Sequence, residues 1–504
     1  MTDAPQAPVS PDRHQAIAAL ITPALASIVD LVVWVEEIEG ERVAHAANHL
    51  GRVRLRPGGR HEVLDGRDPI ASEDPLAFLP YARELADAAP HLSVDNAYPL
   101  AAERILSLFA DATRSPDLAI VHTPRHYFPD EGGHLGEHGS LDVIQSRAPL
   151  LLAGAGVRRH GYVDEYARLV DVGPTMAALA GVPQEDLRDA AGAPLDGRLL
   201  HAYLEEGVVP RAVVGILWDG AHCSDLLDLA ERGELPAVAS LIERGVALRG
   251  GAVAQFPSVT LTNHTSILTG LGPGRHGVLG NVFYDRATGE RVVPNDETTW
   301  HRSAEWLRPA VRTVFELVNE VVPATGAPRT ASIDEAIDRG ADYSTMQLIR
   351  ASGSSSGAGG LGDQLPDAAT SPFPGDPTLL DDPYFRWGVA VDDLGLAQVR
   401  QLWADPGRAP RLTWWANVVT DAGHHAGGPR SAPARDALRQ ADARLAVFLE
   451  QLTELGVVDE VAIVLTADHG FEGADPQVTG SWRPALDALG LDYRDEGPGF
   501  VYLL

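Results

Sequence analysis

Three short polar segments, called corners below, directly follow buried apolar runs in the second part of this 504-residue sequence. Asp219 follows "VVGILW", Asp421 and His425 lie in "TDAGHHAGGP", and the pair Asp468-His469 follows "EVAIVLTA". Carboxylates together with neutral imidazoles suit Zn²⁺, with Mn²⁺ as the alternative. A single Asp at a strand end is commonly a turn or N-cap residue. Corners of this kind on successive strand ends indicate instead a metal site.

A segment rich in hydroxyls lies between the first two corners. The stretch "QFPSVTLTNHTSILTG" (255–270) places Ser258, Thr260 and Thr262 at the start of a predicted helix. A hydroxyl at a helix start that faces a metal ion can act as a nucleophile. The alternative is that these hydroxyls only cap the helix. The pattern alone leaves both interpretations open.

Strands that alternate with helices must position these corners. Apolar runs at 116–124, 148–157, 212–220, 411–420 and 460–470 are predicted as buried strands, with helical patterns between several of them. This alternation predicts an α/β fold with a mostly parallel sheet and helices on both faces. In such sheets, sites collect beyond the carboxyl ends of the strands. Each acidic corner lies at such an end.

Three further regions are predicted from local pattern. The stretch "VDLVVWVEEI…ERVAHAA…GRVRLRP" (29–57) predicts two or three strands with turns. Residues 351–377 are of low complexity and are predicted as a surface loop. Residues 1–12 are rich in Pro and Ala and are predicted to be disordered.

Composition excludes several classes of function. The net charge of −30 argues against a nucleic-acid polymer or an anionic membrane surface as a partner. The sequence has no lysine, so all 40 basic residues are arginine, which excludes P-loop NTPases, kinases and pyridoxal enzymes. A single cysteine, Cys223, excludes an intramolecular disulfide and a multi-cysteine zinc site. With no signal-peptide pattern and no long apolar run, we expect a cytoplasmic protein.

The motifs together resemble the nucleotide pyrophosphatase/phosphodiesterase branch of the alkaline phosphatase superfamily. The resemblance rests on a nucleophile segment with Pro257, Thr260, Asn263-His264, Thr269-Gly270 and His276-Gly277. The segment "DAGHHAGGP" resembles the family's Asp-x-x-x-His motif, and its Gly-Pro ending selects His425 rather than His424 as the ligand. "SIDEAIDRGADYST" (332–345) is similar to the stretch between nucleophile and second corner. The resemblance implies an alkaline-phosphatase-like three-layer sandwich with a smaller insert or cap within about 283–390.

One family ligand is missing from its usual place. The family has a metal-binding histidine followed by Gly downstream of the Asp-His-Gly corner, but no histidine follows His469 here. The stretch 117–157 resembles that histidine loop, and 168–182 resembles the family's closing helix. We therefore expect a circular permutation, in which 13–208 is the C-terminal half of the catalytic domain and 209–504 its N-terminal half. The alternative is that the first part is a separate domain with a decayed copy of the fold.

The missing ligand is then His138, with His134 as its rival in the same loop. The position before Gly139 and the following strand favours His138. His122, His126 and His424 are expected to lie outside the ligand set, and His264 and His276 to brace the nucleophile loop.

The resemblance implies a site with two divalent cations and defined residue roles. One ion is held by Asp219, Asp468, His469 and the Thr260 oxygen, and the other by Asp421, His425 and His138. Thr260 attacks phosphorus and forms a phospho-threonine intermediate, while Asn263 and the Thr260 amide bind a non-bridging oxygen. Two divalent ions also offset the acidic net charge locally.

The predicted function is hydrolysis of a small phosphodiester or nucleotide pyrophosphate. A sulfatase is disfavoured because the nucleophile position is Thr, and a phosphonoacetate hydrolase is disfavoured because that family binds its substrate with lysines. Phosphomonoester or phosphonate hydrolysis is the alternative, and a non-catalytic metal-stabilised binding module is a further one. The aromatic segments 281–285 and 385–389 are expected either to stack against the leaving group of the substrate or to belong to the hydrophobic core. The sequence does not decide whether the protein forms a homodimer.

Overall fold

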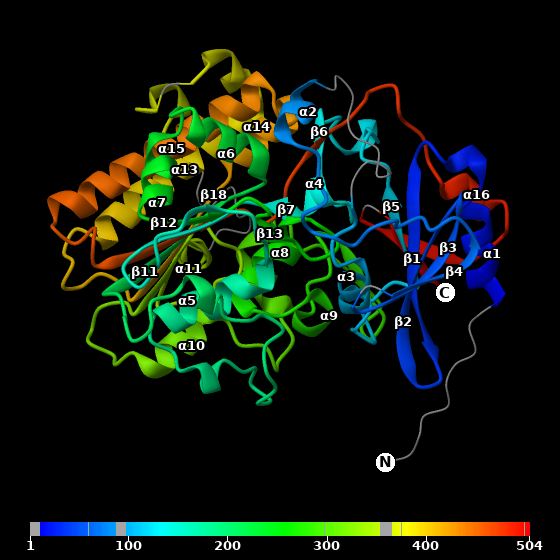
Figure 1. The fold of residues 1–504 in the computed structure, drawn as a ribbon, viewed down its shortest axis with the longest axis horizontal. Coiled ribbons are helices and arrows are strands. Elements are labelled where there is room, and N and C mark those ends of the chain that lie inside the picture. The colour runs from blue at the N-terminus through cyan, green and yellow to red at the C-terminus, as the bar shows by residue number, and fades with distance from the viewer. Residues whose placement is uncertain are drawn as a thin grey trace.

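An eight-stranded sheet forms the centre of the larger lobe (Figure 1). The computed structural model describes residues 11–58, 60–86, 97–296, 298–352, 365–373, 375–497 and 499–504. Residues 1–10 of the expected disordered terminus and 353–364 of the expected surface loop lie outside these ranges. In spatial order the strands are β17 (Tyr343–Ser344), β16 (Thr330–Ile333), β18 (Leu412–Asn417), β11 (Ala212–Trp218), β19 (Val461–Thr466), β8 (Leu150–Gly154), β12 (Gly245–Leu248) and β9 (Gly161–Val163).

The pairing in this sheet is mostly parallel, as the alternation of strands and helices predicts. Strands β17, β16, β18, β11 and β19 run parallel to one another, and β8 alone is antiparallel to both of its neighbours. Every residue of β11, β18 and β19 is buried, which explains their continuous apolar runs. The carboxyl ends of β16, β18, β11 and β19 therefore meet at one edge of the sheet.

Helices cover both faces of the main sheet, so this lobe has three layers. One face carries α5 (Val172–Leu179), α8 (Thr260–Thr269) and α10 (Val314–Val321). The other carries α7 (Pro236–Glu243), α13 (Pro383–Leu402), α14 (Val419–Gly427) and α15 (Ala432–Glu454). Figure 1 shows α7, α13 and α15 above the sheet and α5 and α10 below it. The predicted α/β three-layer fold is confirmed.

A second, antiparallel sheet builds the smaller lobe, and the sequence pattern did not predict this sheet as a separate layer. Its order is β21 (Tyr493–Glu496), β22 (Phe500–Leu503), β5 (Leu118–His122), β1 (Val29–Ile38), β2 (Glu41–Asn48), β3 (Gly51–Arg56) and β4 (Arg60–Gly66). Alternate β1 residues are buried on opposite faces. Val32 and Trp34 pack with α1 (Pro11–Leu20) and α16 (Arg483–Asp487), whereas Leu31 and Val33 belong to the larger core with α3 (Ala101–Leu108).

Short ladders connect segments that are distant in the sequence. β6 (Gly136–Glu137) pairs antiparallel with β20 (Glu472–Gly473), which joins the loop of His138 to the corner of Asp468. β7 (Arg147–Ala148) and β10 (Ala167–Arg168) flank β13 (Ala252–Val253) just before the nucleophile segment. The cap region expected within 283–390 contains the hairpin of β14 (Phe283–Asp285) and β15 (Glu290–Val292) and the 3₁₀ turn η7 (Trp300–Trp306).

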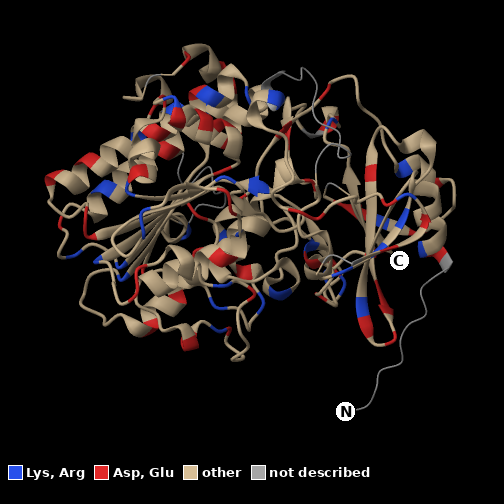
Figure 2. Ribbon diagram, in the orientation of Figure 1, with Lys and Arg blue, Asp and Glu red and all other residues tan. Residues whose placement is uncertain are grey.

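Charge is spread over the whole molecule. Figure 2 shows Asp and Glu on the outer helices of the larger lobe and in the smaller lobe, with Arg interspersed among them. Among the described residues, no helix is both long and apolar enough to cross a membrane. The net charge of −30 thus reflects a general excess of carboxylates over both lobes.

Candidate active site

Three groups of ligand-type side chains meet at the carboxyl edge of the main sheet. Within each group the offered atoms lie within 4.8 Å of one another. The groups are His138, Asp421 and His425; Asp219, Asp421 and His469; and Asp219, His264 and Asp468. The structure thus brings together every Asp and His that the sequence predicts as a ligand. His138 joins them from a segment that lies far earlier in the chain.

Backbone carbonyl oxygens orient the three predicted imidazole ligands. The Nδ1–H of His138 donates to Ser258 O at 3.1 Å, that of His425 to Gly136 O at 2.9 Å, and that of His469 to Gly470 O at 3.1 Å. Each ring therefore keeps Nε2 as the electron-pair donor. Burial lowers the pKa of His425 and of His469 to about 3, so both rings are neutral near pH 7. Neutral imidazoles are the form that binds metal ions.

The carboxylates of the site have buried oxygens without hydrogen-bond partners among the described residues. These are Asp219 Oδ1, Asp421 Oδ1 and Asp468 Oδ2. Burial, with the charge of Asp468 second, raises the pKa of Asp219 to about 7, and burial raises that of Asp468 to about 6. Buried charges are stable when they are paired or coordinate a metal. The orphaned oxygens and the mixed Asp/His donor set fit divalent cations.

Tight local geometry holds the carboxylates in position. Gly220, with φ +61°, follows Asp219 directly, and a Cβ there would lie 2.2 Å from the Phe471 ring. Its backbone N–H donates to Asp468 Oδ1 at 2.9 Å. The Tyr384 hydroxyl donates to Asp421 Oδ2 at 2.7 Å. Tyr384 lies 37 positions before Asp421, so no short motif pointed to this contact.

Thr260 is the first residue of α8 and lines a cavity next to the carboxylates. The cavity has a volume of about 490 Å³, and Asp219 and His264 also line it. Ser258 and Thr262, the other hydroxyl candidates, are completely buried. The Ser258 hydroxyl donates to Ser140 O at 2.8 Å and accepts from Gly139 N at 3.2 Å. Ser258 therefore joins the nucleophile segment to the His138 loop, whereas Thr260 faces the cavity.

The structure does not bring Asn263 to the predicted position at a non-bridging oxygen. Its Oδ1 accepts from Gln255 N at 2.7 Å, and its Nδ2 donates to Pro257 O at 3.2 Å and to Val259 O at 3.0 Å. The side chain is fully buried, so its amide braces the loop before α8. Asn281 lies next to the nucleophile position instead, because its Oδ1 accepts from Leu261 N at 3.1 Å, directly after Thr260.

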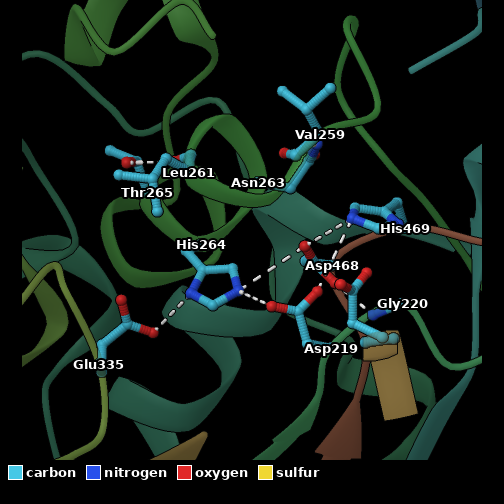
Figure 3. A network of polar contacts seen from close by, with 12 residues as sticks. Asp219, Gly220, Val259, Leu261, Asn263, His264, Thr265, Glu335, Asp468 and His469 are labelled. Atoms are coloured by element: carbon cyan, nitrogen blue, oxygen red, sulfur yellow. Dashed lines mark hydrogen bonds and ion pairs between the residues drawn. The ribbon is translucent and has the colours of Figure 1, made fainter. Parts of the chain in front are cut away.

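His264 links the site to a buried acid (Figure 3). Its Nε2 lies 3.6 Å from both Asp219 Oδ2 and Asp468 Oδ2, and its Nδ1 lies 2.9 Å from Glu335 Oε2. Trp414 Nε1 also donates to Glu335 Oε2 at 2.8 Å. Burial acts to lower the pKa of His264, but the carboxylates around it, Glu335 first, raise that pKa well above its usual value. From sequence, His264 was expected only to brace the nucleophile loop.

The other histidines take more remote positions. The His134 ring packs 4.2 Å from the His425 ring, and the groups of ligand-type side chains include His138 but not His134. His424 donates its Nδ1–H to Thr420 O at 2.6 Å and packs on Phe471. His122, His126 and His276, which the sequence also placed outside the ligand set, do not belong to these groups of ligand-type side chains. His276 Nε2 lies 3.0 Å from Ser266 Oγ of α8, which agrees with a bracing role.

Comparison with protein families gives one long match. Residues 213–503 match the type I phosphodiesterase / nucleotide pyrophosphatase family, which is more than half of the chain. An uncharacterized pyrophosphatase/phosphodiesterase of Schizosaccharomyces pombe is 39% identical over 103 residues, 19% of this chain and 20% of that protein. Alkaline phosphatase PafA of Elizabethkingia meningoseptica is 32% identical over 90 residues, 18% of this chain and 16% of that protein. The chain thus spans a fifth or less of the length of these curated relatives.

Solved structures give partial matches. Phosphonoacetate hydrolase from Sinorhizobium meliloti in complex with phosphonoformate is 25% identical, with a TM-score of 0.34, covering 52% of this chain and 57% of that one. Murine ectonucleotide pyrophosphatase/phosphodiesterase 5, as an inactive variant in complex with AMP, is 16% identical, with a TM-score of 0.38, covering 53% and 59%.

Proposed function

The chain belongs to the type I phosphodiesterase / nucleotide pyrophosphatase family of the alkaline phosphatase superfamily, and on that premise we propose that it hydrolyses phosphodiester or nucleotide pyrophosphate bonds of small molecules. The observation that carries the proposal is the meeting of His138, Asp421, His425 and the Asp219 and Asp468 corners beside Thr260. Two divalent cations, Zn²⁺ as first choice and Mn²⁺ as the alternative, suit this donor set.

Each cation position has its own residues in this proposal. Asp219, Asp468, His469 and the Thr260 oxygen hold one cation, and His138, Asp421 and His425 hold the other. Cations bound there neutralise charge on the phosphoryl group and favour the ionised form of the attacking oxygen. The orphaned oxygens of Asp219, Asp421 and Asp468 support this assignment.

Thr260 is the nucleophile in this proposal. Its Oγ1 forms a bond to phosphorus while the bond from phosphorus to the leaving oxygen breaks, and water later cleaves the phospho-threonine and restores the hydroxyl. The Thr260 amide, at the free N-terminus of α8, and Asn281 Nδ2 donate to the non-bridging oxygens as charge builds up. The contact of Asn281 Oδ1 with Leu261 N supports this orientation.

We also propose that the two parts of the chain form one catalytic domain in permuted order. Strand β8, from the first part, lies between β19 and β12 of the second part. His138 lies with Asp421 and His425, and α5 packs on β11 and α8. These placements support complementary halves, 13–208 and 209–504, rather than a separate domain with a decayed copy.

Nitrophenyl esters test the function. Protein loaded with Zn²⁺ or Mn²⁺ is expected to release p-nitrophenol faster from bis-p-nitrophenyl phosphate than from p-nitrophenyl phosphate. Thr260→Ala should lower kcat by roughly a thousandfold or more, because it removes the nucleophile. Thr453→Ala, at the end of α15, is the control. Preference for the monoester would favour a phosphomonoesterase, and no turnover of either ester would favour a binding module.

A further inference from the structure

Helix α13 packs against α14, the helix that carries Asp421 and His425. Of the two interpretations of segment 385–389, which lies on α13, the structure places Phe385 in the core and Trp387 at the wall of the cavity described above. Further along α13, two residues contact the first turn of α14. The proposed chemistry gives this contact no role.

The carboxylate of Asp392 on α13 takes the place of an N-cap side chain for α14. Val418 is the N-cap residue of α14, and its apolar side chain makes no capping hydrogen bond. Instead, Asp392 Oδ1 accepts from Val418 N at 2.8 Å, and Asp392 Oδ2 accepts from Val419 N at 3.3 Å. Asp392 lies 26 positions before Val418 and is completely buried. A carboxylate in this position satisfies free N–H groups and faces the positive end of the helix dipole.

A glycine one turn earlier lets the two helices approach closely. Gly388 precedes Asp392 by four positions, so both residues lie on one face of α13. A Cβ at Gly388 would lie 3.2 Å from Val419 Cα and 3.4 Å from Val419 N, so the backbone of α14 would have to move to accept it. The start of α14 is therefore fixed by the Asp392 hydrogen bonds and by close packing on Gly388.

The interior position of the Asp392 carboxylate is costly. Burial raises the pKa of Asp392 to about 7, although the charge of Arg444 acts to lower it. The Arg444 guanidinium is itself completely buried, and its Nε donates to the neighbouring Asp393 Oδ1 at 2.9 Å. Buried carboxylates are stable only when they are hydrogen-bonded or paired. The hydrogen bonds that stabilise Asp392 lie at the start of the helix that carries two of the predicted metal ligands.

The far end of α14 is connected to the His138 loop. Leu135 N donates to His425 O at 2.9 Å, and the Nδ1–H of His425 donates to Gly136 O at 2.9 Å. Asp421 is the third residue of α14, close to the end that Asp392 holds. A shift of the helix start would therefore move Asp421 relative to His138 and His425.

We propose that Asp392 is a positioning residue for the cation held by His138, Asp421 and His425. It fixes the start of α14, so that Asp421 stays within reach of the two imidazoles. The inference rests on the proposed function, because it concerns one of the two proposed cations. Asp392 is not part of the groups of ligand-type side chains, so it acts through the backbone of α14. Loss of a group that orients metal ligands typically lowers metal affinity by roughly 10–100-fold.

Zinc titration of Asp392→Asn tests this role. The amide keeps one acceptor oxygen but turns an NH₂ group toward the second backbone N–H. Competition with a chromophoric zinc chelator gives a dissociation constant for each ion. We expect one of the two constants to rise roughly tenfold or more and the other to stay within about twofold. Excess Zn²⁺ should restore kcat/KM for bis-p-nitrophenyl phosphate.

The His138→Ala background identifies the ion that is affected. This variant is expected to lack the cation at the His138 position, so adding Asp392→Asn should leave the affinity for the remaining ion unchanged. Asp393→Asn is the matched control from the same helix. It removes the partner of Arg444 and should lower the melting temperature of the metal-free protein, while both zinc affinities stay as in the wild type.

Gly388→Ala provides a second test, which also serves if Asp392→Asn fails to fold. The added Cβ displaces Val419 and should weaken the same ion. Wild-type zinc affinities in these variants, an equal loss for both ions, or the same loss in Asp393→Asn would overturn the positioning role. Wild-type protein that binds both ions but cleaves neither nitrophenyl ester would overturn the proposed hydrolysis alone.

Discussion

At the residue scale, the site depends on imidazoles whose second nitrogen is occupied by the backbone. Ser258 O, Gly136 O and Gly470 O accept from the rings of His138, His425 and His469. Such outer contacts fix the ring orientation and the tautomer of a metal-binding histidine. The two rings of the His138 loop differ here, because His138 stacks on His469 at 3.8 Å, whereas His134 packs against His425 at 4.2 Å.

His138→Ala is predicted to remove one of the two cations. The variant leaves Asp421 and His425 as the protein donors at this cation position. The amount of zinc bound per chain should therefore fall from about two to about one. Inductively coupled plasma mass spectrometry after dialysis measures this amount. Phosphodiesterase activity should fall with it. His134→Ala is the matched control from the same loop and should keep both ions. If the two variants bind the same amount of zinc, the assignment of His138 is wrong.

At the element scale, loops from distant parts of the chain are tied together next to the site. The ladder of β6 and β20 joins the His138 loop to the Asp468 corner. Ser258 joins the same loop to the nucleophile segment through Ser140 O and Gly139 N. The loop of His138 therefore has support on two sides, and that support fixes the distance between the ligand sets.

Ser258→Ala is predicted to weaken the site without unfolding the protein. It removes both side-chain hydrogen bonds but keeps the carbonyl that orients His138. We expect kcat/KM and zinc affinity to fall roughly tenfold, the order found for groups that orient a metal ligand. Ser240→Ala removes a hydroxyl that donates to Ala237 O in α7, far from the site, and serves as the control. Equal kinetics for the two variants would contradict this role.

His61 on β4 is predicted to make the smaller lobe less stable at alkaline pH. Its Nδ1 lies 2.6 Å from Asp68 Oδ2 and its Nε2 2.9 Å from Glu73 Oε1. Burial acts to lower the pKa of His61, but these two carboxylates outweigh burial and raise it. A raised pKa in the folded state stabilises the protein fully below about pH 6.5, the unfolded value. The stabilisation is lost as the pH rises through the folded value.

His61→Gln should therefore lower the melting temperature more at pH 6 than at pH 9. A loss of about 1 kcal/mol is expected at pH 6, the order for a partly exposed ion pair. Differential scanning calorimetry of both proteins at the two pH values measures the difference. His201→Gln, in a surface 3₁₀ turn, controls for the general effect of losing an imidazole. An equal decrease at both pH values would contradict the proposed ion pairs.

Local sequence patterns predicted which segments form strands of the main sheet, but they did not predict which other elements those strands contact. Each Asp corner follows a fully buried strand, so apolar runs that end in a carboxylate located Asp219 and Asp468 from sequence. The smaller lobe was missed because strand β1 is buried on both faces, and its pattern does not show which elements cover it. Contacts such as Tyr384 with Asp421, or Glu335 with His264, depend on tertiary packing and have no short-range signal.

At the scale of the whole molecule, both parts of the chain contribute to each lobe. The first part supplies β8 and β9 to the main sheet, and the last residues supply β21 and β22 to the smaller sheet. Trp482, Leu486 and Val501 pack with α1 in one hydrophobic cluster. Strands of each part therefore pack against elements of the other part in both sheets.

Residues 209–504 produced alone are predicted to be insoluble or unfolded. Without β8, the edges of β19 and β12 are unpaired, and open strand edges promote aggregation. Co-expression of 1–208 and 209–504 should give a soluble complex that binds zinc and hydrolyses bis-p-nitrophenyl phosphate. Size-exclusion chromatography and activity measure the outcome. A soluble 209–504 fragment with full zinc content would favour the alternative of a separate first domain.

The interior position of β8 also governs when the protein can fold. During translation, β8 leaves the ribosome long before β19, its partner on one side, has been made. The ribosome adds about 5–20 residues per second, so the apolar β8 strand waits many seconds for that partner. We expect the main sheet to form only near the end of synthesis, and molecular chaperones that shield the nascent chain should raise the yield of active protein.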